Sequence, residues 1–437
     1  MDMTFARHNP VLSAAVVAVA VFAAAFGALT LLNRSSAPPA APPAVADGAA
    51  PARSTDGRID QLQAQVRAAP KQADGWALLG DAYLQKVRET GDASFYTRAA
   101  GVLRRALALS PNDAGALAGA GTLALARHDF ATGLRYGEAA HRAAPNVVLP
   151  LGVIVDAQVE LGRYGEAART LNRMVDLKPN LASYARVSYF RELHGDLRGA
   201  LEAMRYAVSA GGGAPENVAY VQTLLGNLEL ALGHTAAARF AYRQALAGLP
   251  RYVPATVGLA RVEAGERDYG PAIRRLRGAV ARLPLPEYVV ALGETELAAG
   301  RRTAARRDLA LVDAEERLLR VNGVNTDVDL ALFEANHGDP ARGVALARRA
   351  WGAAPSVRSA DALGWSLTRA GNPAAGLRWA KRSLRLGSAD PAFLYHAGMT
   401  ARATGHAALA QRWLRRALAR NPRFSPLYAP RARAALR

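Results

Sequence analysis

Residues 224–250 read LLGNLELALGHTAAARFAYRQALAGLP, and this stretch decides the fold. Its apolar residues recur every three to four positions on both sides of Gly233, which is the spacing of an amphipathic helix. Glycine breaks the first helical run, and Pro250 ends the second because proline cannot continue a helix. The stretch therefore predicts two antiparallel helices joined by a short turn.

The closing proline recurs along the chain at a fixed interval. Pro111, Pro145 and Pro179 are 34 residues apart, and Pro250 and Pro284 are separated by the same interval. A helix–turn–helix unit with this period indicates stacked hairpins, because one hairpin cannot bury its apolar face alone. We expect about ten such units.

This pattern resembles the tetratricopeptide repeat (TPR) family from about Ala73 to Pro422. At the front of the array it is carried by Trp76, Leu79, Gly80, Tyr83, Ala99, Leu103, Ala106 and Pro111. The resemblance implies an all-α fold, an α-solenoid of about ten TPR helix-turn-helix repeats. Close packing within each pair further predicts small partners, Ala or Gly, opposite the first-helix glycines Gly80, Gly121, Gly226, Gly293 and Gly364.

Residues 11–32 read VLSAAVVAVAVFAAAFGALTLL and carry no charge. At ~1.5 Å per residue, a helix over this run is long enough to cross a bilayer. We expect an N-terminal transmembrane helix, with a cleaved signal peptide as the alternative. The chain is then expected to be a single-pass cell-membrane protein with its repeats outside the cytoplasm, or a secreted protein if the segment is cleaved.

Composition and spacing divide the rest of the chain into segments. Proline and alanine dominate the linker, and such a composition stays extended. Short helices at both ends of the array are expected to cover its exposed apolar ends. The expected segments are a tail at 1–10, a linker at 33–53, a capping helix at 54–72, the repeat array at 73–424 and a C-terminal capping segment at 425–437.

The chain is basic, with 55 Lys and Arg against 36 Asp and Glu and a formal net charge of +19. This charge favours an acidic partner or a solvated basic surface. Polyanion or nucleic-acid binding is an alternative function. Nucleic acid is the less expected partner, because the aromatic residues are not interleaved with basic runs and no RNA-binding module is present.

No catalytic pattern occurs in the sequence. The chain has no cysteine, and it lacks the H-E-x-x-H, G-x-x-x-x-G-K-[ST] and G-x-S-x-G motifs. We therefore expect no enzyme activity, no catalytic residue, no cofactor and no metal site. Four glutamates recur at one position of the first helix, and we expect them to pair with arginines of neighbouring repeats: Glu229, Glu263, Glu296 and Glu334.

In the TPR family the first helices line a concave groove that binds partners. Carried onto this chain, the resemblance implies the groove residues Arg186, Tyr189, Tyr220, Asn227, Arg261, Asp361, Trp365, Tyr395 and Met399. Arginines and aromatic residues supply charge and rigid contact area for a protein or peptide. We expect a membrane-anchored interaction scaffold or assembly factor. The other alternative is a regulatory subunit of an enzyme such as a glycosyltransferase.

Overall fold

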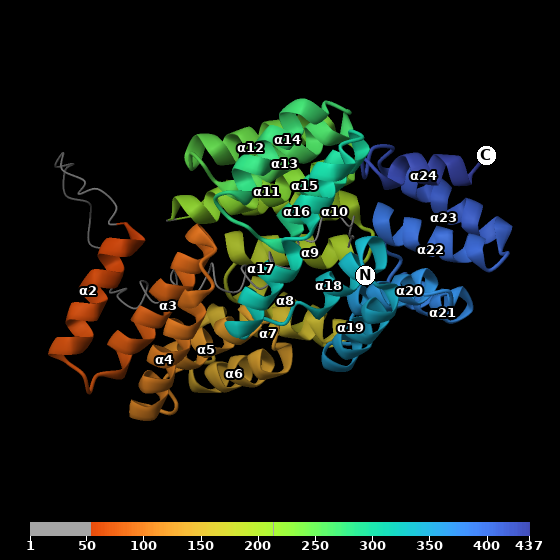
Figure 1. Ribbon diagram of the computed structural model, residues 1–437. Helices are drawn as coiled ribbons and strands as arrows, with labels where there is room; N and C mark the ends of the chain where they lie inside the picture. Colours follow the sequence, from red (N-terminus) through yellow and green to blue (C-terminus); the bar gives the residue numbers. More distant parts are fainter. Residues whose placement is uncertain (1–53, 213) are drawn as a thin grey trace. The chain divides into compact units, whose positions relative to one another are not determined.

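The computed structural model describes residues 54–212 and 214–437. The secondary structure in these ranges is entirely helical (Figure 1), so the prediction of an all-α repeat protein is confirmed for this part of the chain. The chain forms consecutive helix pairs joined by short turns.

The helix pairs follow one another in chain order. They are α3 (Ala73–Thr90) and α4 (Ser94–Leu109), α5 (Ala114–Ala126) and α6 (Phe130–Ala143), α7 (Val148–Glu160) and α8 (Tyr164–Leu177), α9 (Leu181–Leu193) and α10 (Leu197–Ser209), α11 (Pro215–Ala231) and α12 (Thr235–Gly248), α13 (Val253–Gly265) and α14 (Tyr269–Val280), α15 (Pro286–Ala298) and α16 (Arg302–Leu309), α18 (Asp327–His337) and α19 (Pro340–Ala353), α20 (Val357–Arg369) and α21 (Pro373–Ser383), and α22 (Pro391–Ala403) and α23 (Ala407–Arg420). Three helices stand outside the pairs: α2 (Thr55–Ala68), α17 (Val312–Val321) and α24 (Tyr428–Ala435).

Two compact units make up the described chain, residues 54–157 and residues 158–437. In the first unit α2 packs on α3 and buries Ile59, Leu62 and Val66, and α3 to α6 pack in succession. In the second unit successive pairs stack from α9 to α16 and from α18 to α23, α17 packs on α15, and α24 packs on α22 and α23. Aliphatic and aromatic residues from α15 to α24 form one continuous core in the second unit.

Turn chemistry sets the ends of the paired helices. Gly195 has a φ of 79°, a left-handed conformation that glycine adopts without strain. Asp196 then accepts a hydrogen bond of 2.8 Å from the backbone N–H of Gly199 and caps α10. Asp339 likewise caps α19, because its side chain accepts a hydrogen bond of 2.9 Å from the backbone N–H of Ala341.

The packing opposite the first-helix glycines differs from the prediction at three of the five positions. A Cβ at Gly80 would lie 2.6 Å from Leu103, one at Gly226 would lie 2.5 Å from the ring of Tyr242, and one at Gly293 would lie 2.5 Å from Leu309. The prediction of small partners was therefore wrong at these positions. Because glycine has no side chain, a large residue of the second helix fits directly against it. Any side chain at the glycine position would clash with that residue, so glycine is required there. Gly121 and Gly364 do face glycine and alanine, as well as larger residues.

One repeat departs from the regular pair. Helix α16 ends at Leu309, after eight residues, and α17 follows it as an additional helix before α18. The sequence signals this irregularity because this repeat has no closing proline. Helix α17 is therefore an insertion between two regular pairs.

The membrane prediction requires a correction. Residues 11–32, on which it rested, lie outside the described residues, as do the tail at 1–10 and the linker at 33–53. Within 54–212 and 214–437, no helix combines the length and the apolar character needed to cross a bilayer. The expectation of a single-pass cell-membrane protein is accordingly corrected.

Candidate functional site

The expected groove residues all lie on first helices of their pairs, but most are not open to solvent. Those on α9, α11, α13, α20 and α22 with buried side chains are Arg186, Tyr220, Arg261, Asp361, Trp365 and Tyr395. The remaining three are half-buried: Tyr189, Asn227 and Met399. That these nine residues contact a partner stays a prediction.

The residues on α20 and α22 form a packed polar and aromatic cluster. The carboxylate of Asp361 lies 2.8 Å from Nδ1 of His396, and both side chains are buried. The indole of Trp365 stacks on the imidazole of His396 with ring centroids 4.5 Å apart, and its Nε1 donates to Asn336 at 2.9 Å. Sequence reasoning missed His396, because a lone histidine on a helix gives no signal until its carboxylate partner is placed.

The residues on α11 and α13 are also tied into the interior. The hydroxyl of Tyr242 donates to Oδ1 of Asn227 at 2.8 Å. The guanidinium of Arg261 is buried, and burial lowers its pKa, while the neighbouring tyrosines Tyr242 and Tyr288 act in the opposite direction. These side chains fix the packing of neighbouring pairs.

Hydrogen bonds also join distant pairs of the second unit. The hydroxyl of Tyr428 in α24 donates to Oε1 of Glu294 in α15 at 3.0 Å, although the two residues are 134 positions apart. The side chain of Asn421 donates to the carbonyl of Leu230 at 2.7 Å, across 191 positions. The array in this unit therefore places its last helices against α11 and α15.

A second set of long-range contacts involves α8 and α20. The hydroxyl of Tyr164 accepts a hydrogen bond of 2.9 Å from the backbone N–H of Val357, across 193 positions. Nearby, the guanidinium of Arg358 lies 3.8 Å from the carboxylate of Glu160, and both groups are buried. Burial raises the pKa of Glu160, and Arg358 opposes that shift.

Two further buried carboxyl groups have strongly shifted pKa values. Burial raises the pKa of Glu287 to about 7, with Asp329 adding to the shift and Arg261 opposing it. Burial likewise raises the pKa of Asp329 to about 6, against the effect of Arg358. Buried ionisable groups of this kind make stability depend on pH.

The recurring glutamates pair with arginines, but only Glu229 and Glu296 do so across neighbouring repeats, as the sequence predicted; Glu263 and Glu334 pair with an arginine of their own helix pair. The nitrogen–oxygen distances are 3.1 Å for Arg205–Glu229, 2.9 Å for Arg275–Glu263, 2.5 Å for Arg277–Glu296 and 2.7 Å for Arg342–Glu334. Each glutamate is buried and each arginine is partly exposed, so the pairs bridge the interior to the surface of the array.

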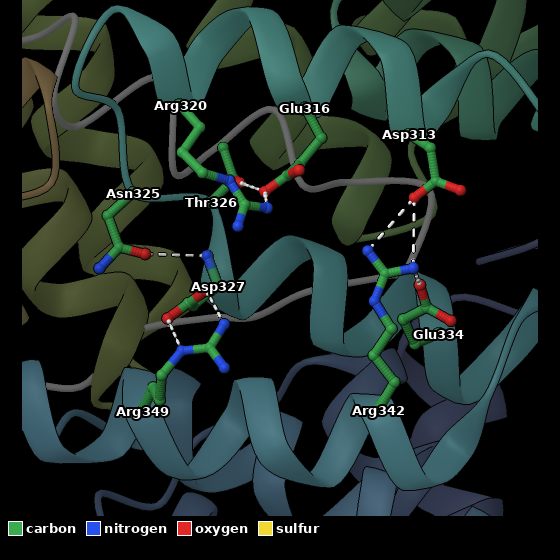
Figure 2. Close-up of polar contacts among 9 residues, drawn as sticks. All are labelled: Asp313, Glu316, Arg320, Asn325, Thr326, Asp327, Glu334, Arg342 and Arg349. Carbon is green, nitrogen blue, oxygen red and sulfur yellow. Dashed lines mark hydrogen bonds and ion pairs between the residues drawn. The ribbon is translucent and has the colours of Figure 1, made fainter.

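Polar contacts also hold the inserted helix in place (Figure 2). Arg342 of α19 bridges Asp313 of α17, at 3.3 Å, and Glu334 of α18. Within α17, Glu316 forms an ion pair with Arg320. Its carboxylate also accepts a hydrogen bond of 3.0 Å from the hydroxyl of Thr326. One side of α17 is therefore bound to its neighbours through charged and hydroxyl groups.

The opposite side of the same helix is apolar and exposed. Leu318 is 56% exposed and Val321 is 84% exposed, and Leu311, which precedes the helix, is 46% exposed. With the exposed Ala314, these residues are spaced by three, four and three positions and share one face of the helix. We call Leu311, Ala314, Leu318 and Val321 the α17 face.

Among the residues that the structure describes, no group of His, Asp and Glu side chains could hold a metal ion. In the buried Asp361–His396 pair, the imidazole packs against the rings of Trp365 and Tyr395.

Comparisons with known proteins bear on the fold. No family model matches the chain, and no curated protein matches it. Solved structures do: a chain of the APC/C hetero-tetramer Cut9-Hcn1 is 17% identical, with 87% of this chain and 81% of that chain covered and a TM-score of 0.38. The human IFIT1 dimer with PPP-AAAA is 14% identical, with 83% and 87% covered and a TM-score of 0.45.

A third solved structure, of the MamA protein, is 18% identical and covers 39% of this chain and 91% of its own, with a TM-score of 0.29. At these identities the likeness concerns the fold alone. The chain's own helices repeat as antiparallel pairs at the expected interval. This repeating pattern fits the tetratricopeptide repeat fold that the sequence predicts.

Proposed function

We propose that this chain is a protein-interaction scaffold that docks a partner protein on the α17 face and catalyses no reaction of its own. The observation that carries the proposal is the exposed apolar side of α17, a helix inserted into an otherwise regular array. Single exposed apolar residues are common on protein surfaces, but a continuous row on one helix face is a feature of interaction sites.

The helix cannot rotate to bury this face. Val312 is buried in the core, and Glu316 is buried against Thr326 and Arg320. Turning α17 inward would expose a core valine and separate a buried carboxylate from its partners, and both changes are unfavourable. The apolar side is therefore held toward solvent.

The spacing of the face fits an amphipathic helix of the partner. Side chains three and four positions apart on one helix pack into the grooves of another. Arg317 is exposed beside Ala314 and Leu318, so an acidic residue next to the partner's apolar row would find a cation there. The proposed partner segment is an amphipathic helix with acidic residues flanking its apolar side.

Site-specific photo-crosslinking tests this proposal. A benzophenone side chain placed at position 318 in the full-length chain should capture one partner in native extracts. The control is the same group at Phe240 of α12, which is also a strongly exposed apolar residue (65%) but is isolated from the α17 face. The captured protein should then bind the chain when both are purified. Capture of the same proteins at both positions, or loss of binding after purification, would refute the proposal.

The groove residues remain a second proposed contact surface. Tyr189, Asn227 and Met399 are its half-buried members, and a partner could reach them without unpacking the interior. The crosslinking group placed at Met399 tests this surface separately from the α17 face.

A further inference from the structure

The last repeat and its capping segment carry only one sign of charge. After Asp390 the sequence contains no aspartate or glutamate. The same 47 residues contain nine arginines. They are Arg402, Arg412, Arg415, Arg416, Arg420, Arg423, Arg431, Arg433 and Arg437. About half of the net charge of +19 therefore lies in this short C-terminal part.

The carboxylate that would pair with an arginine is missing at one defined position of the first helix. In α11 to α19 the first helix of each pair supplies a glutamate to an arginine, and in α11 and α15 it stands three residues after the glycine, Gly226 or Gly293. Three residues after Gly364 of α20 the chain has Leu367, and three residues after Gly398 of α22 it has Ala401. The final two pairs thus lack the carboxylate that neutralises arginines earlier in the array.

Helix α23 concentrates the unneutralised charge on one side. Arg412, Arg416 and Arg420 are four residues apart and exposed, so they follow one face of the helix, which we call the arginine row. The opposite face, with Trp413 and Leu414, is buried. Desolvation lowers the pKa of Arg416, and the charges of Arg420 and Arg412 lower it further, so the three cations repel one another. In the described chain, none of the three forms an ion pair with a carboxylate.

We propose that the arginine row binds the phosphodiester backbone of a nucleic acid. Guanidinium groups match phosphate oxygens in a bidentate geometry, and a row of them places several phosphates along one helix. Binding releases the counterions of the nucleic acid and relieves the repulsion within the row. This site is separate from the α17 face, and each can exist without the other.

The surroundings of the row favour a nucleic acid over an acidic protein or a membrane. Protein interfaces need large apolar anchors, and the exposed ones of the described chain lie between Leu177 and Val321, before α23. An amphipathic helix on a membrane inserts its apolar side into lipid, but the apolar side of α23 is buried in the protein. A partner recognised through charge alone fits the row, and phosphate contacts are recognised in that way.

The test measures binding of the full-length chain to fluorescent single-stranded RNA of about 20 nucleotides and to DNA of the same sequence. The triple variant Arg412→Gln, Arg416→Gln, Arg420→Gln removes the row. The matched control is Arg243→Gln, Arg274→Gln, Arg282→Gln, which removes the same charge from exposed arginines of α12, α14 and the turn after α14. Polyglutamate serves as a competitor of the same sign of charge.

We expect the wild-type chain and the control to bind at least one of the two nucleic acids, with affinity falling steeply between about 50 and about 200 mM salt. The row variant should bind at least tenfold more weakly. Its slope of log affinity against log salt should be shallower by about 2, or roughly 0.7 for each phosphate contact removed on a single strand. Binding of RNA alone, of DNA alone or of both supports the proposal and identifies the source of the phosphates.

Three results would overturn the proposal. The first is no binding by the wild-type chain at the lower salt concentration. The second is equal weakening in the row variant and in the control, which would mean that only net charge matters. The third is displacement of the nucleic acid by polyglutamate at equal charge concentration, which would show that the row does not distinguish phosphate from carboxylate. Circular dichroism of both variants checks that the fold is retained.

Discussion

The hydroxyl of Tyr428 donates a hydrogen bond of 3.0 Å to Oε1 of Glu294, and this bond joins the last helix of the chain to the middle of the array. Glu294 is fully buried, and the same oxygen lies 2.9 Å from Nε2 of His337. A buried carboxylate is stabilised only when its oxygens have donors. Helix α24 is therefore held by a specific polar contact in addition to its apolar packing.

Tyr428→Phe removes this donor while keeping the ring. We expect the free energy of unfolding to fall by about 1–3 kcal/mol, because Glu294 loses a buried hydrogen bond. Hydrogen–deuterium exchange should rise in α24 and α15. Tyr206→Phe is the control, since the hydroxyl of Tyr206 is at the surface and the side chain is 54% exposed. Equal exchange in both variants would contradict the role given to the Tyr428–Glu294 bond.

Gly226→Ala tests the close contact between α11 and α12. The new methyl group would lie 2.5 Å from the fully buried ring of Tyr242, so the pair must separate or the ring must move. We expect destabilisation of about 1–3 kcal/mol in urea denaturation. Gly278→Ala in α14 is the matched change at a glycine with no atom within 4 Å of the added carbon. That variant should gain about 0.5–1 kcal/mol from helix propensity, and a loss similar to that of Gly226→Ala would disprove the steric explanation.

Glu287 makes stability depend on pH in a defined direction. Its pKa is about 7 in the folded chain against a usual 4.5, so the folded state holds this proton more tightly than the unfolded state does. The stability from this group is complete below the unfolded value and is lost as the pH rises through the folded value. The raised pKa of Asp329, about 6, acts in the same direction over a lower range of pH.

We therefore expect the urea midpoint of the wild-type chain to fall between about pH 5 and about pH 8. Glu287→Gln should reduce this fall, because glutamine stays neutral over the whole range. A variant with the same pH dependence as the wild-type chain would show that Glu287 does not titrate in this window.

Val312→Ala tests whether the buried side of α17 fixes the helix. The valine is almost completely buried in the core of the second unit, so its truncation should cost about 1–3 kcal/mol. Hydrogen exchange should increase in α17 before it increases in α15 or α18. Ala314→Gly on the exposed side is the control for lost helix propensity, at about 1 kcal/mol. Faster exchange throughout the second unit, without preference for α17, would contradict the local role of Val312.

The regular part of the fold follows from local sequence rules. Proline spacing and apolar periodicity predict the helix pairs, and glycine with aspartate predicts turns such as Gly195–Asp196. The recurrence of Glu229 and its equivalents predicts pairing with arginine, and the ion pairs are present. These features depend on residues within one or two repeats of each other.

The long-range contacts of the second unit could not be predicted in the same way. Tyr164 meets Val357 across 193 positions, and Asn421 meets Leu230 across 191. Such contacts depend on small rotations between neighbouring pairs that accumulate along the array. The missing closing proline predicts that this repeat is irregular. It does not predict that an additional helix, α17, follows or that one side of this helix is exposed.

Docking of a partner protein on the α17 face is tested most directly by the affinity of the crosslinked partner for purified variants of this chain. Calorimetric titration should compare Leu318→Asp with Phe240→Asp, both of which place a charge at a strongly exposed apolar position. We expect Leu318→Asp to weaken binding by at least about tenfold, or ~1.4 kcal/mol, while Phe240→Asp binds like the wild-type chain. Equal affinity for the two variants would contradict it.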